Sequence, residues 1–68
     1  MTMEQIAADL TERIKRGEYA PGAQLPTYAT LAGLYSVSGG TIARVMILLC
    51  ATGVVVGVPG RGVFVPDA

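Results

Sequence analysis

Histidine is absent from this sequence, cysteine occurs once, and charged side chains make up only 15% of the chain. With no histidine and with Cys50 as the lone thiol, we expect neither a metal site nor an intramolecular disulfide, and no cofactor. Cys50 also lacks a histidine or a cationic cluster that would activate it as a nucleophile. Asp9 and Glu12 are interpreted as surface charges rather than a catalytic dyad. We therefore expect that the chain is not an enzyme.

Charge is both scarce and unevenly distributed. Five basic and five acidic side chains give a formal net charge of zero, which counts against a nucleic-acid partner because phosphate neutralisation requires a basic face. However, Arg44 and Arg61 are the only charged residues between positions 19 and 66. The middle of the chain is therefore weakly but purely positive.

Neither a signal peptide nor a membrane span is expected. Acidic residues at positions 4, 9 and 12 interrupt any apolar run near the N-terminus. The uncharged stretch 45–58 is shorter than the ~20 residues that cross a bilayer, and Gly53 interrupts it. Together with the lone cysteine, these features predict a cytoplasmic chain with no membrane partner.

The spacing of apolar residues predicts three helices. We expect them over residues 3–16, 28–35 and 39–52. Thr27 and Ser38 are suitable N-caps for the second and third helices, because a hydroxyl oxygen can accept from a free N–H group of the first turn. Gly17 and Gly53 are typical of positions that end a helix.

The periodicity changes after Gly53. β-branched and aromatic residues fill positions 54–56, 58 and 63–65, on either side of the glycine-rich segment 59–62. This pattern predicts a β-hairpin with its tip at 59–62. Three helices followed by a hairpin are typical of a mainly α winged helix-turn-helix fold, and we expect one such domain over residues 1–68.

Residues 28–47 fit a helix-turn-helix template. Ala32 supplies the small side chain required where two helices cross near a right angle, and Val37 is placed to fill the turn. Ser36 stands where glycine is most usual, since the turn needs a left-handed residue. The last helix is expected to turn three apolar residues toward the core: Ile42, Val45 and Leu49.

Three stretches resemble the DNA-binding domain of GntR-family repressors. They are residues 6–27, 34–49 and 52–65. The specific parts are the loop at 17–26, the Val37-Ser38 entry to the last helix and the Gly60-Arg61-Gly62 tip. The resemblance implies a dimeric, double-stranded DNA-binding transcription regulator, specifically a repressor. It also implies that helix 39–52 lies in the major groove and the 59–62 wing tip in the minor groove.

On this basis ten residues are expected to contact DNA. They are Thr27, Tyr28, Ser38, Gly39, Gly40, Thr41, Arg44, Gly60, Arg61 and Gly62. Hydroxyls and first-turn N–H groups can meet phosphates, and an arginine between two glycines suits a narrow minor groove. Two alternatives stay open: Thr41 supports the helix instead of reading DNA, and Gly39-Gly40 simply loosens the first turn.

The chain also departs from the family. Arginine is usual in the family at the positions of Ala29, Gly39 and Ala43, so we expect weaker DNA binding than in its relatives. The sequence ends just past the expected wing, so no effector domain is expected. Ile47, Cys50 and Val58 either form a surface for a homodimer or another protein or are scattered surface hydrophobes, and both interpretations stay open. The alternative function is therefore a winged-helix protein–protein interaction module that has lost most DNA contacts.

Overall fold

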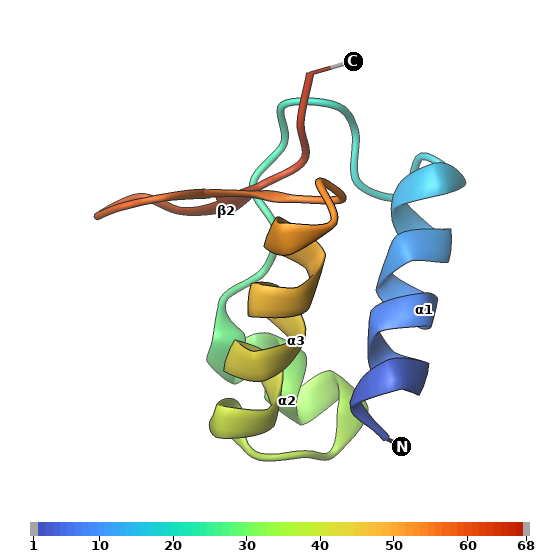
Figure 1. The fold of residues 1–68 in the computed structure, drawn as a ribbon, viewed down its shortest axis with the longest axis vertical. Coiled ribbons are helices and arrows are strands. Elements are labelled where there is room, and N and C mark those ends of the chain that lie inside the picture. Colours follow the sequence, from blue (N-terminus) through green and yellow to red (C-terminus); the bar gives the residue numbers. More distant parts are fainter. Residues whose placement is uncertain (1, 68) are drawn as a thin grey trace.

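The computed structural model describes residues 2–67, and this part of the chain contains three helices and one β-hairpin (Figure 1). The elements are α1 (Met3–Lys15), α2 (Tyr28–Tyr35), α3 (Gly39–Ala51), β1 (Val56–Val58) and β2 (Gly62–Phe64). In Figure 1, α1 stands alongside α3, and the hairpin tip projects away from α1. The winged helix-turn-helix architecture expected from the sequence is confirmed.

Each helix begins at a hydroxyl side chain. Thr2 and Gln5 form a capping box at α1, in which each side chain accepts a hydrogen bond from the other residue's backbone N–H. Thr27 and Ser38 each accept from the N–H group three residues further on, at 3.2 Å. Both N-caps predicted for α2 and α3 are thus confirmed. α3 ends one residue earlier than expected, with Thr52 as its C-cap.

The turn between α2 and α3 bends the chain by 107°, within the range of helix-turn-helix motifs. Ser36 provides the left-handed residue of this turn, with φ of 55°. The Val37 N–H donates to the Ala32 carbonyl at 3.0 Å, and both side chains pack against the core. The inward packing of both side chains agrees with the places predicted for them in the motif.

All three helices contribute to one apolar core. Its fully buried large side chains are Ile6, Leu10, Leu31, Ile42, Val45, Met46 and Val55. Ile42, Val45 and Leu49 face inward as predicted, each no more than 3% exposed. Because side chains three and four residues apart share a helix face, the opposite face of α3 is presented outward.

The wing strands differ from the prediction. They run over Val56–Val58 and Gly62–Phe64 and pair antiparallel, with Gly57 opposite Val63. Strand was also predicted at position 65, which instead bonds the connector at Ala23, and at positions 54 and 55 directly after α3, and these predictions were wrong. The N–H groups at positions 54 and 55 both donate to the Leu49 carbonyl at the end of α3, and Val55 is 2% exposed in the core. These two valines close the helix and fill the core, so they are unavailable for pairing with β2.

The connector between α1 and α2 is tied to the wing. The Leu25 N–H donates to the Val63 carbonyl at 2.8 Å, and the Val65 N–H donates to the Ala23 carbonyl at 2.9 Å. Gln24 forms an isolated antiparallel bridge with Phe64. The hairpin is therefore held along one edge by a segment that the sequence indicated only as a loop.

The uncharged stretch 45–58 does not form one continuous helix. Its first part belongs to α3 and its last part to β1, with Gly53 at φ of 80° between them. Within residues 2–67, no single helix is long and apolar enough to cross a membrane. Only α2 and α3 taken together reach that length and composition, and they are bent by 107°.

A polar network joins α1 to α2. The Tyr35 hydroxyl donates to Asp9 Oδ2 at 2.6 Å, and Arg13 Nε donates to the same oxygen at 2.8 Å. Arg13 also bonds Glu18 at 2.9 Å. The hydrogen bond from Tyr35, followed by that from Arg13, lowers the pKa of Asp9 below its usual 3.8. The ionised form of Asp9 therefore stabilises the fold.

Replacing Tyr35 by phenylalanine is expected to lower the free energy of unfolding by about 1 kcal/mol at neutral pH, because one hydrogen bond is lost. The Asp9 contribution is present above its unfolded pKa and is lost as the pH falls through its lowered folded pKa. The difference between the two proteins should therefore shrink below about pH 4. Urea unfolding across this pH range measures it. Tyr28→Phe is the control, and equal losses at every pH would contradict the assignment.

Candidate nucleic-acid interface

The hydroxyl groups at the starts of α2 and α3 already serve the helices. Thr27 bonds both the N–H and the hydroxyl of Thr30, at 3.2 and 2.9 Å. Ser38 accepts from the Thr41 N–H, and the Ser38 and Thr41 hydroxyls lie 3.1 Å apart. This contact favours the interpretation of Thr41 as a support for the start of α3. Thr27 and Ser38 remain exposed, so a phosphate can still reach them.

Gly39 and Gly40 leave the first turn of α3 open. Apart from the neighbouring residues and the backbone of α3 itself, nothing in residues 2–67 lies within 4 Å of a Cβ built on Gly39, and at Gly40 the nearest such atom is Ser38 Oγ at 3.8 Å. Packing within the domain therefore does not require glycine at either position. The missing side chains leave the first N–H groups of α3 uncovered, which is the arrangement that an anion at a helix N-terminus needs.

Arg44 on α3 and Arg61 at the wing tip are the two cations of these elements. Both are exposed, and within residues 2–67 the ion pairs involve Arg13 instead. Three acidic residues, Glu4, Asp9 and Glu12, belong to α1, which stands on the side of α3 away from the hairpin tip (Figure 1). Although the net charge of the chain is zero, α3 and the wing therefore carry positive side chains and no acidic ones.

The wing tip is held by a residue that the sequence analysis did not single out. Gln24 Nε2 donates to the Arg61 carbonyl at 2.8 Å. The Arg61 N–H in turn donates to the Val58 carbonyl at 3.0 Å, which closes the turn. Gln24 thereby fixes the backbone that carries the Arg61 side chain. No local pattern could have indicated this contact, because the two residues are 37 positions apart.

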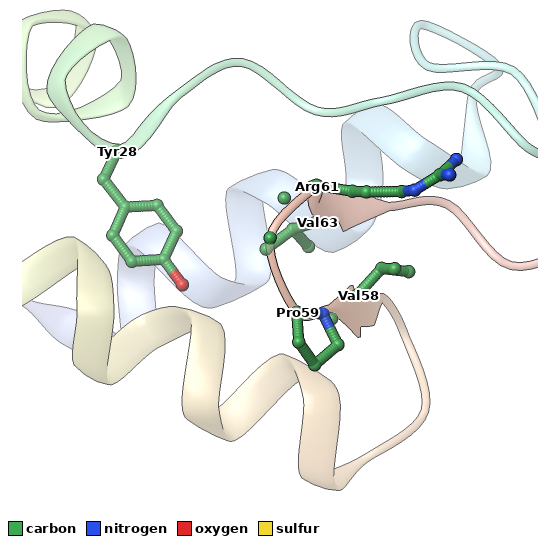
Figure 2. A pocket seen from close by; sticks show the side chains of 8 residues that line it. Tyr28, Val58, Pro59, Arg61 and Val63 are labelled. Atoms are coloured by element: carbon green, nitrogen blue, oxygen red, sulfur yellow. The ribbon is translucent and has the colours of Figure 1, made fainter.

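An open groove of about 660 Å³ separates the start of α2 from the wing. Its lining comprises Tyr28 and residues 57–63. Figure 2 shows the Tyr28 ring pointing toward the wing, whereas the Arg61 side chain extends away from Tyr28. The groove thus brings together two parts of the predicted site, Tyr28 and the tip at 60–62, from distant positions in the sequence.

The three residues predicted to form a partner surface lie on α3 and β1. Ile47 is 70% exposed, Cys50 is exposed and Val58 is half-buried. Cys50 adjoins the wing, because its Sγ lies 3.7 Å from a Cβ built on Gly57. The exposed apolar surface of α3 therefore continues to the base of the wing. Within residues 2–67, no cluster of three side chains that could hold a metal ion is present.

Comparison with protein families assigns the chain to a family of bacterial regulators. A family model described as bacterial regulatory proteins of the gntR family matches residues 2–65. The uncharacterized HTH-type transcriptional regulator YurK of Bacillus subtilis is 36% identical over 61 residues. The match covers 90% of this chain and 25% of YurK, so the chain spans about a quarter of the length of this curated relative.

Solved structures agree with the family assignment. A GntR family transcriptional regulator from Listeria monocytogenes matches with a TM-score of 0.90 and 27% identity, covering 97% of this chain and 58% of that one. AraR(DBD) in complex with operator ORR3 matches with a TM-score of 0.86 and 28% identity, covering 93% and 76% of the two chains. The chain belongs to the gntR family of bacterial regulatory proteins and is a GntR-type winged helix-turn-helix DNA-binding domain.

Proposed function

We propose that the domain binds operator DNA with α3 in the major groove and the wing tip at 59–62 in the minor groove, and that it represses transcription. The observation that carries this proposal is a pair of exposed arginines, one on the outer face of α3 and one at the wing tip, that form no ion pair within residues 2–67. Their guanidinium groups are the long-reaching donors suited to base edges and to a narrow minor groove. The operator complex of AraR(DBD) supports DNA as the ligand.

The other eight predicted contacts are proposed to position the DNA backbone. Hydroxyls of Thr27, Tyr28, Ser38 and Thr41 would meet phosphates, as would the first N–H groups of α3 at Gly39 and Gly40. Gly60 and Gly62 would allow the wing tip close approach to the groove. We further propose that two copies bind a two-fold symmetric operator in the bacterial cytoplasm.

Replacing Arg44 or Arg61 by alanine is expected to weaken DNA binding about tenfold each, with a salt dependence lowered by about one phosphate equivalent. Sequences selected from random duplexes at low salt supply the probe, and fluorescence anisotropy measures affinity at several salt concentrations. Lys15→Ala on α1 removes the same charge away from the interface and should leave the affinity nearly unchanged. If the domain bound no duplex even at low salt, DNA binding would be ruled out.

A second candidate function is docking of a protein partner on α3. The observation that favours it is Ile47, a large apolar side chain that is 70% exposed beside Cys50 and Val58. Single exposed apolar residues are common, so self-association through Ile47 in the absence of DNA is the discriminating readout. Sedimentation should show an oligomer that Ile47→Glu disrupts, while a monomer at every concentration would count against this function.

A further inference from the structure

The outward face of α3 carries few groups that could form hydrogen bonds to bases. Gly40, Ala43 and Ile47 follow one another at spacings of three and four residues, which puts them on one face. Gly40 and Ile47 are exposed and Ala43 is half-buried. The polar side chains of α3 are those of Thr41 and Arg44 apart from Cys50. The Thr41 hydroxyl already bonds that of Ser38, which leaves Arg44 as the long polar side chain that can reach a base.

Such a face suits one feature of the major groove. Each base edge there presents hydrogen-bond donors and acceptors, except that thymine adds an apolar C5 methyl group. Alanine and other apolar side chains contact this methyl group, whereas arginine, asparagine and glutamine read the polar groups. A helix that presents Ala43 and Ile47 can therefore gain most from bases that carry methyl groups.

We propose that α3 recognises thymine methyl groups, so that the preferred DNA carries thymines where Ala43 and Ile47 face the major groove. This inference rests on the proposed DNA-binding function and specifies the DNA that the same site prefers. Arg44 would then supply phosphate attraction or a single polar contact next to the apolar ones.

Charge distinguishes DNA from a second copy as the occupant of this face. Neither α3 nor the wing contains an acidic residue, and Arg44 lies directly beside Ala43. A symmetric contact presents the same patch from both subunits, so a second copy here would bring two Arg44 charges together, at an electrostatic cost. A duplex instead supplies negative phosphates around an apolar methyl surface.

The test compares four duplexes of ~20 base pairs, two helical turns. Two contain alternating A·T or A·deoxyuridine pairs, and two contain alternating inosine·cytosine or inosine·5-methylcytosine pairs. Within each pair only the C5 methyl group changes, and the minor groove that meets the wing stays the same. Fluorescence anisotropy at low salt should give about fourfold tighter binding for each methyl group contacted, from ~0.8 kcal/mol per buried carbon.

Ala43→Gly and Ile47→Ser are each expected to lower the thymine-to-uracil affinity ratio. Ala8→Gly is the matched control, because Ala8 is exposed on α1 and carries the same helix penalty. Equal affinities for methylated and unmethylated duplexes would overturn this inference and leave DNA binding itself intact. A ratio that neither α3 variant lowers, or self-association that Ile47→Glu abolishes in place of methyl dependence, would also overturn it. Loss of binding to all four duplexes would instead contradict the proposed function.

Discussion

Ile42→Ala is expected to remove about 3 kcal/mol from the free energy of unfolding. Ile42 is fully buried on the face of α3 that packs against α1 and α2, so truncation leaves a cavity where three helices meet. A domain of 68 residues has roughly 3–10 kcal/mol of stability in total. The loss should therefore lower the melting temperature by more than about 10 °C, and circular dichroism would measure it.

Ile47→Ala is the matched control for this experiment. It makes the same substitution in the same helix, but Ile47 is 70% exposed, so the expected loss is within about 0.5 kcal/mol. The comparison tests the orientation of α3, on which the whole candidate interface depends. Similar losses for the two variants would mean that Gly40 and Arg44 do not face outward, and the proposed DNA contacts would then have no basis.

The elements that the sequence predicted well depend on local physics. Thr27 and Ser38 mark helix starts because each cap bonds an N–H group only three residues away. The burial of Ile42 and Leu49 follows from helical periodicity alone. Ser36 adopts the left-handed conformation because the turn template requires it, even though serine is not the favoured residue.

The features that the sequence did not predict depend on contacts between distant residues. The Tyr35–Asp9 hydrogen bond spans 26 positions, and Gln24 reaches Arg61 across 37. The strand prediction at positions 54 and 55 was wrong for another reason. A run of valines is compatible with either a strand or a core segment. Here the N–H groups of both residues donate to the Leu49 carbonyl at the end of α3, which excludes pairing with β2. The residues of the candidate site can therefore be predicted from the sequence, whereas the long-range contacts that hold them in place cannot.

Gly62→Ala is expected to lower the free energy of unfolding by about 2 kcal/mol and to weaken DNA binding at least tenfold. Gly62 has φ of 123°, a conformation that is costly for other residues. In addition, a Cβ at this position would lie 2.7 Å from Gln24 Nε2. The Gln24 side chain would have to move away, and its hydrogen bond to the Arg61 carbonyl would be lost.

Two further variants separate the components of this effect. Gly53→Ala also introduces a side chain at a positive φ, here 80°, but its Cβ would have no atom of residues 2–67 beyond its chain neighbours within 4 Å. It should reduce stability and leave DNA affinity per folded molecule unchanged.

In a Gln24→Ala background the contact with Gln24 is absent, so Gly62→Ala should cost only the backbone strain, and the two effects should not add. Additive losses would mean that Gln24 does not restrain the wing tip. If the losses are not additive, Gln24 sets the position of Arg61 without touching DNA itself. Gln24 would then favour DNA binding by restraining the wing tip beforehand, since a flexible tip loses conformational entropy each time it enters a groove.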